Sequence, residues 1–203
     1  MPPPERTPDG SLAAIATQLA DHELVTAAQG GDRGALDQLL RRHYDRVHAV
    51  CRRITGHDAD AADATQEAMI AIVRNLDRFD GRSSFVTWSY RVATNACLDE
   101  LRRRRRRPVP VDEMTIAAPA RDDLAAGVAD RLSVDGALAA LPPEFRAAVV
   151  LRDVCELDYA EIAEVLEIPP GTVRSRIARG RAAVSSYLAG NLEPPDHRQI
   201  PSP

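Results

Sequence analysis

The chain has 203 residues, of which 44% are hydrophobic, and its 26 basic and 30 acidic side chains leave a formal net charge of −4 at pH 7. This length suits one domain or two small ones with packed cores. No apolar run is long enough for a membrane span and the N-terminus does not resemble a signal peptide, so we expect a cytoplasmic protein without membrane insertion. Aromatic residues are few and alanine is abundant, which favours helices.

The three cysteines, Cys51, Cys97 and Cys155, are widely separated and form no C-x-x-C pair. This spacing indicates neither a disulfide framework nor a zinc site. We interpret them as small buried apolar residues in a reducing compartment, and we expect no metal and no cofactor.

Residues 1–20 are rich in proline and polar groups and are predicted to form a mobile lead-in. Helical periodicity begins near Asp21, is broken by a Gly-Gly pair, and resumes after Asp32, a residue type that caps helix N-termini. The inward positions of this longer helix are predicted to be Leu36, Leu39, Leu40, Tyr44, Val47, Val50, Cys51 and Ile54. His43 and His48 are five residues apart, on different faces of such a helix, so we interpret them as surface or edge residues and not as metal ligands.

Gly56 is predicted to end that helix, and Asp58 or Asp60 to begin another that runs to Phe79. The polar face of this next helix carries Asp63, Gln66, Glu67, Arg74 and Asp77. An Asp-Gly turn then leads to a further helix, so residues 21–107 are predicted to form one all-helical unit.

That further helix, within residues 83–107, begins with aromatic residues and ends in six consecutive arginines. Its buried stripe is predicted to be Trp88, Val92, Cys97, Leu98 and Leu101, and its exposed stripe Arg91, Asn95, Asp99 and Arg102. Arginines neutralise phosphates, asparagine reads base edges and aromatic rings stack on unpaired bases, a combination that suits melted nucleic acid. Core roles for Trp88 and Tyr90 remain an equal alternative. The arginines could also simply cap a solvated helix end, although six in a row exceed what capping needs.

Charge is segregated along the chain. Gly81 to Arg107 holds eight arginines and two acids, whereas Val109 to Asp130 holds five acids and one arginine. Because three prolines interrupt the acidic stretch, residues 108–130 are predicted to form a flexible, semi-extended linker.

A second helical unit is predicted over residues 131–190. Leu138 and Leu141 line a short helix, and Pro143 can begin the next one as a first-turn proline. The inward residues of that helix are predicted to be Phe145, Ala148, Val149 and Val154. Asp158 and Glu161 have the capping-box spacing at the start of a third short helix.

A longer helix is predicted to follow from Gly171, after a turn. Val173, Ile177 and Val184 share one face, and four arginines lie elsewhere on this helix, which has no acidic residue up to Gly190. The pattern predicts a helix-turn-helix whose second helix enters a major groove, with a generic pair of short helices as the alternative. Residues 191–203 are proline-rich and are predicted to be a disordered tail.

Five motifs together resemble the extracytoplasmic-function (ECF) sigma factors of bacterial RNA polymerase. They are D-A-T-Q-E-A at 63–68, F-V-T-W-S-Y-R-V-A-T-N at 85–95, L-P-P-E-F-R at 141–146, Y-A-E-I-A-E-V-L at 159–166 and G-T-V-R-S-R-I-A-R-G-R at 171–181. The resemblance covers about residues 21–107 and 131–189. It implies an all-α chain with a sigma region 2 domain, an acidic linker and a region 4 helix-turn-helix domain, acting in transcription initiation and not as an enzyme.

The resemblance also implies roles for particular residues. Docking on the clamp helices of the largest subunit of core RNA polymerase is implied for Asp63, Gln66 and Glu67, and the polymerase flap is a further expected contact. Binding of the melted −10 promoter element is implied for Gly81, Arg82, Ser83, Ser84, Arg91, Asn95, Arg102 and Arg103. Binding of the −35 element is implied for Arg174, Ser175, Arg176, Ala178, Arg179 and Arg181, the first two on bases and the arginines that follow mostly on phosphates. We also expect an anti-sigma factor that clamps both domains.

Two other classes of function are alternatives. A stand-alone helix-turn-helix regulator would explain the second unit alone, and it would bind promoter DNA without polymerase. An enzyme with a fused DNA-binding domain is disfavoured, because residues 21–107 contain no glycine-rich phosphate loop, no H-E-x-x-H and no serine or cysteine nucleophile motif.

Overall fold

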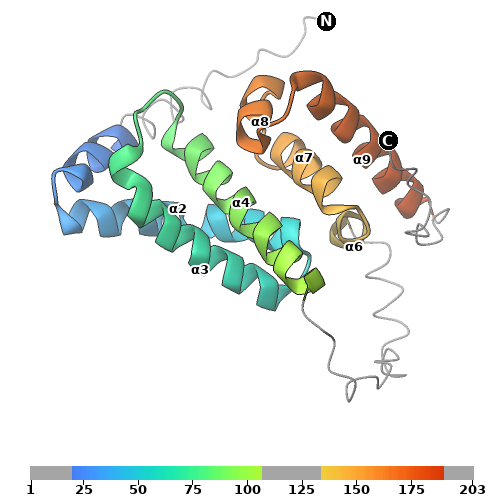
Figure 1. Cartoon of the computed structure of the whole chain (residues 1–203), viewed down its shortest axis with the longest axis horizontal. Helices are drawn as coiled ribbons and strands as arrows, with labels where there is room; N and C mark the ends of the chain where they lie inside the picture. Colours follow the sequence, from blue (N-terminus) through green and yellow to red (C-terminus); the bar gives the residue numbers. More distant parts are fainter. Residues whose placement is uncertain (1–19, 107–133, 190–203) are drawn as a thin grey trace, which may run out of the picture.

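The computed structural model describes residues 20–106 and 134–189, and within these ranges every regular element is a helix. The first module contains a helix over residues 20–29, α2 (Arg33–Thr55), α3 (Asp58–Asn75), the 3-10 helix η1 (Leu76–Arg78) and α4 (Phe85–Arg106). The second module contains α6 (Val134–Ala139), α7 (Pro143–Asp153), α8 (Tyr159–Leu166) and α9 (Pro170–Leu188). The prediction of two all-α modules is confirmed (Figure 1). Apart from residue 20, the predicted lead-in, linker and tail lie outside the described residues.

Local sequence signals set most helix ends. Asp32 caps α2 as predicted, because its Oδ1 accepts hydrogen bonds from the N–H groups of Gly34 and Ala35 at 2.8 and 3.1 Å. Gly56 ends α2 with a φ of 78°, a left-handed conformation that glycine adopts without strain. Of the two starting points predicted for α3, the helix uses Asp58.

The core of the first module lies where α2, α3 and α4 pack together, around residues that include Leu39, Ile54 and Ile72. Three aromatic rings extend this core: Phe79, Phe85 and Trp88 have centroids 5.3 to 5.9 Å apart. Tyr90 is buried, so the core interpretation of that residue is confirmed, whereas Trp88 is only partly buried.

The prediction for His43 was wrong, as was the prediction for its neighbour Tyr44. His43 is only 2% exposed, whereas Tyr44 is 46% exposed. His43 lies inward because it packs 4.9 Å from the Phe85 ring centroid and has its Nε2 3.0 Å from Oδ2 of the buried Asp21. This approach is not aligned as a good hydrogen bond, and burial lowers the pKa of His43 more than Asp21 raises it.

The buried face of α4 also differs from the predicted stripe. Of that predicted stripe only Cys97 is fully buried. The other buried residues of α4 are Phe85, Thr87, Ser89, Tyr90, Ala93 and Thr94. This set is wider than one helical stripe because α4 is covered on two sides, by α2 and α3 on one and by the second module on the other. The predicted exposure of Arg91 and Asn95 is confirmed.

The second module is a helix-turn-helix, α8 and α9, supported by α6 and α7. Asp158 and Glu161 form the predicted capping box, with Asp158 Oδ1 accepting from two backbone N–H groups and Glu161 Oε2 accepting from Asp158 N at 2.9 Å. Pro143 begins α7 as predicted, but Val154 is 43% exposed and not inward, because it follows the last turn of that helix. The turn into α9 begins at Glu167, which has a left-handed φ of 53°.

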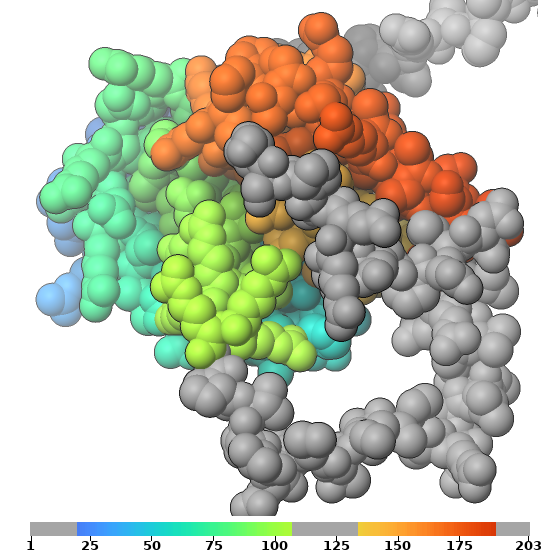
Figure 2. Space-filling model, turned by 45° about the vertical axis from the view of Figure 1, so that its right-hand side comes forward, coloured from blue at the N-terminus to red at the C-terminus, as the bar shows by residue number. Residues whose placement is uncertain are grey.

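The two modules pack directly on each other. α4 lies against α8 and α7, and α2 lies against α6 and α7 (Figure 1). In the space-filling view the second module, orange to red, rests on the first, blue to green (Figure 2). Buried apolar residues of both modules therefore belong to one continuous cluster.

Candidate nucleic-acid interface

The loop between η1 and α4 presents several of the residues predicted to hold melted DNA. Gly81 has a left-handed φ of 72°, and the neighbouring Arg82 side chain is 90% exposed, 3.0 Å from Asp80. Ser84 Oγ accepts a hydrogen bond from Thr87 N at 3.0 Å and so caps α4. Ser84 and the serine before it are partly buried, which leaves the glycine and arginine as the projecting part of the loop.

The predicted −10 residues on α4 differ in how they are paired. Asn95 is exposed, and no described residue bonds to its side chain. Arg102 lies 2.9 Å from the preceding Asp99, and Arg103 lies 3.3 Å from Glu100. Such exposed pairs are weak, so these arginines remain available to phosphates.

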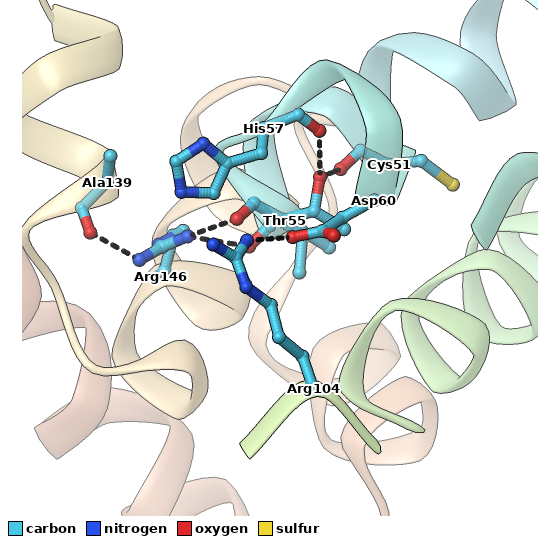
Figure 3. A network of polar contacts seen from close by, with 8 residues as sticks. Cys51, Thr55, His57, Asp60, Arg104, Ala139 and Arg146 are labelled. Atoms are coloured by element: carbon cyan, nitrogen blue, oxygen red, sulfur yellow. Dashed lines mark hydrogen bonds and ion pairs between the residues drawn. The ribbon is translucent and has the colours of Figure 1, made fainter. Parts of the chain in front are cut away.

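A groove of about 540 Å³ between α3 and α4 brings together two predicted sites. Its lining residues are Asp63, Gln66, Glu67, Glu100, Arg103, Arg104 and Arg106. The three residues predicted to dock on polymerase are exposed and form one wall, while the arginines of α4 form the other. Arg104 also pairs with Asp60 of α3, which ties the arginine end of α4 to this groove (Figure 3).

The predicted −35 residues lie along α9. Val173, Ile177 and Gly180 face inward, whereas Arg174, Ser175, Ala178, Arg179 and Arg181 are exposed and Arg176 is partly exposed. α9 approaches α7 closely at Gly180, where an added Cβ would lie 2.5 Å from Val149 Cγ2. The outward face carries arginines and small residues without an acid, as a helix entering a major groove requires.

Two of the α9 arginines have partners within the second module. Arg174 Cζ lies 6.0 Å from the ring centroid of Tyr159, and Arg152 Cζ lies 5.2 Å from the same ring. Arg181 makes a bidentate pair with Asp153 of α7, one contact being 3.0 Å, and this pairing raises its pKa. Neither arrangement was predictable from the sequence, because each joins residues of different helices.

A further set of contacts that the sequence did not predict joins the two modules. Thr87 Oγ1 donates to Glu161 Oε1 at 3.2 Å, and Arg91 pairs with Glu167. Arg146 of α7 reaches the C-terminal end of α2, as its stick view shows (Figure 3). The only sequence signal for Arg146 was its place in the L-P-P-E-F-R motif.

The cysteines are buried or half-buried free thiols, as predicted. Cys51 and Cys97 contact each other between α2 and α4; this hydrogen bond lowers the pKa of Cys51 and raises that of Cys97. Burial raises the pKa of Cys155 to about 12. In the two described ranges, no three acidic, histidine or cysteine side chains gather as metal ligands. None of the helices described is long and apolar enough to cross a membrane.

Comparison with known proteins identifies both modules. Residues 39–107 match the family model described as Sigma-70 region 2, and residues 131–184 match Sigma-70, region 4. The chain is 39% identical over 170 residues to the ECF RNA polymerase sigma factor SigM of Mycobacterium tuberculosis, covering 83% of this chain and 85% of SigM. It is 35% identical over 186 residues to the ECF RNA polymerase sigma-E factor of Escherichia coli K12, covering 86% and 97%.

Solved structures show the same fold. CnrH, solved in complex with the cytosolic domain of CnrY, matches with a TM-score of 0.62 and 27% identity over 85% of this chain and 99% of CnrH. RpoE of Bartonella quintana, solved with the anti-sigma factor NepR, matches with a TM-score of 0.58 and 19% identity over 77% of this chain and 98% of RpoE.

Two helical modules, one matching region 2 and the other region 4, define an RNA polymerase sigma factor, and the chain belongs to the sigma-70 family. Its relatives place it among the ECF sigma factors, which confirms the resemblance seen in the motifs. A stand-alone helix-turn-helix regulator leaves the region 2 module unexplained and is not supported.

Proposed function

We propose that this sigma factor binds core RNA polymerase in the cytoplasm and directs it to promoters, with no catalytic activity of its own. The supporting observation is that polar and cationic surfaces suited to nucleic acid occur on both modules, on α4 with its preceding loop and on α9. A duplex-binding regulator needs only the second of these surfaces.

The −35 element is assigned to α9. Arg174 and Ser175, near the N-terminal end of the helix, would reach base edges, because that end of a recognition helix enters the groove. Arg176, Arg179 and Arg181 would contact phosphates and position the helix. Ala178 is exposed between them, and its small side chain lets the helix approach the DNA closely.

The −10 element is assigned to the loop at Gly81 to Ser84 and to the outward side of α4. The loop would hold an unstacked base, for which the protein must offset a few kcal/mol of lost stacking, and Asn95 would read a base edge. Arg91, Arg102 and Arg103 would contact the strand backbone.

The groove beside Asp63, Gln66 and Glu67 is proposed to receive the clamp helices of the largest polymerase subunit, and the second module to touch the flap. An anti-sigma factor is also proposed, and two structures of similar fold support it: CnrH was solved with the cytosolic domain of CnrY, and RpoE with the anti-sigma factor NepR.

Transcription in vitro tests this function. Core polymerase supplied with this chain should initiate at specific sites on a genomic promoter library, and core polymerase alone should not. Arg174→Ala should lower use of the cognate −35 sequence by about 1 to 3 kcal/mol and relax specificity there. Specific binding of a promoter fragment by the free chain, without any polymerase-dependent initiation, would contradict the proposal.

A further inference from the structure

The carbonyl groups at the two ends of the 3-10 helix η1 are held by one side chain from a distant part of the chain. Gln29 Nε2, at the end of the first helix (residues 20–29), donates to Leu76 O at 2.8 Å and to Phe79 O at 2.9 Å. An amide nitrogen carries two hydrogens, so both donors of this side chain are used on these carbonyls. Because the bonded residues are 47 and 50 positions apart, η1 is anchored to an element far from it in sequence.

η1 leads directly into the base-reading loop (residues 80–84), which is proposed to hold an unstacked base of the −10 element. Phe79 ends η1 and Asp80 follows it. Within the loop, Asp80 Oδ1 accepts a hydrogen bond from Arg82 N at 3.1 Å and closes a turn. The far end of the loop is fixed because Ser84 Oγ caps α4. The loop therefore has one anchor at each end, and the anchor at its start is the Gln29 amide.

The Gly-Gly pair after the first helix fixes the place of Gln29. Gly30 N donates to Thr26 O at 3.0 Å, and Gly31 N donates to Ala28 O at 3.0 Å. Gly31 has a left-handed φ of 94°, although a Cβ on it would meet nothing within 4 Å. Glycine is thus required there by backbone conformation and not by space. The turn ends the helix immediately after Gln29, from where the side chain reaches η1.

We propose that Gln29 is a positioning residue for −10 recognition: by holding the carbonyls at both ends of η1 it fixes the base-reading loop and so sets the discrimination between bases of the −10 element. This inference rests on the proposed function, which assigns that loop to the melted strand. Gln29 does not need to touch DNA for this role, because both of its donor hydrogens are bonded to the protein. A loop that is already fixed loses less conformational entropy on binding and presents one arrangement of polar groups to a base.

The size of the effect follows from the two hydrogen bonds. One is half-buried and the other exposed, and a neutral bond of this kind changes an equilibrium by about two- to tenfold. Without these bonds a smaller fraction of the loops has the binding-competent arrangement, and the apparent affinity for the cognate strand falls with that fraction. Phosphate contacts of the α4 arginines do not depend on the loop, so binding of other sequences falls less. Gln29→Met should therefore reduce base discrimination at the −10 element by about two- to tenfold.

The test uses core RNA polymerase with the full chain and a library of promoter templates randomised in the −10 and −35 elements. Sequencing the templates that initiate gives the base preference at each position. Gln29→Met keeps the length of the side chain and removes both donors. Gln38→Met is the matched control, because Gln38 is exposed on α2 and no described residue bonds to its side chain. Gly31→Ala is a second variant that keeps the glutamine but strains the turn that places it.

The positioning role is supported if Gln29→Met flattens the base preference across the −10 element and leaves the −35 preference unchanged, while Gln38→Met changes neither. Gly31→Ala should act in the same direction as Gln29→Met. Equal losses at both elements would show a general loss of stability and overturn the proposal, as would an unchanged −10 preference. Loss of preference at a single −10 position would show a direct base contact by Gln29 and would also overturn it.

Two further outcomes separate this proposal from the proposed function. If Gln29→Met supports no initiation at all, Gly31→Ala decides by the same criteria. If the positioning role fails while the wild-type chain directs initiation, the sigma-factor assignment stands. Absence of initiation by the wild-type chain on every template would remove the function itself.

Discussion

The buried guanidinium of Arg146 gives a quantitative test of how the modules are coupled. Arg146→Met removes four hydrogen bonds from a charged group, each worth about 1.5 to 3 kcal/mol. It also removes a burial cost: desolvation, with a smaller contribution from Arg105, lowers the pKa of Arg146 from 12.5 to about 10, which corresponds to roughly 3 kcal/mol against the charged form. Four such bonds sum to about 6 to 12 kcal/mol and the burial cost subtracts roughly 3, so we expect a net loss of at least about 3 kcal/mol of stability.

Urea unfolding followed by two signals measures this loss and locates it. Trp88 is the only tryptophan and reports on the first module, whereas circular dichroism reports on helices of both. The two curves should coincide in the wild-type chain and separate in Arg146→Met, with a midpoint lower by about 1 to 2 M. Arg152→Met is the matched control on α7, since Arg152 bonds only within its own module, to Leu157 O. Coincident curves in Arg146→Met with less than about 1 kcal/mol lost would refute this account of the coupling.

The other predictions concern pH, specificity and salt. Because burial holds the pKa of His43 below 6.5, the unfolded chain takes up a proton first as the pH falls, so stability should drop below about pH 6.5 by up to about 1.4 kcal/mol per pH unit. Urea unfolding at pH 7.5 and 5.5 measures this, and His43→Gln should remove the dependence. Tyr159→Leu should reduce discrimination at the base that Arg174 reads by about two- to fivefold in a promoter competition, and Tyr159→Phe should preserve it, because the ring face alone attracts the guanidinium. The slope of log DNA affinity against log salt concentration should become shallower by about one unit in Arg176→Ala. The change should be smaller in Arg181→Ala, because the carboxylate of Asp153 on α7 already pairs with Arg181. Equal slopes for the two variants would contradict this.

Features encoded by neighbours in the chain were predictable from sequence. The Asp32 cap, the glycine that ends α2, the first-turn Pro143 and the Asp158–Glu161 capping box each depend on residues within four positions of one another. Because these signals act locally, the helix order and the helix-turn-helix could be predicted before any packing was known.

Features that depend on packing between distant segments were not predictable. His43 is buried because Asp21 and Phe85 converge on it from other helices. The buried side of α4 is broader than its apolar stripe because the second module covers Thr87 and neighbouring positions. Periodicity reveals that a face is buried, but it does not reveal that a second partner covers an adjacent face.

Several locally unfavourable features occur at or beside the contact between the modules. The Thr94 hydroxyl and Arg146 Nε are buried with no hydrogen-bond partner among the described residues, and Glu167 is a non-glycine residue in a left-handed conformation. An unpaired buried polar group costs about 1 to 3 kcal/mol, and strained backbone costs a comparable amount. The two ring nitrogens of His43, in the core of the first module, are likewise buried without a well-aligned hydrogen bond, so such costs are not confined to the contact between the modules.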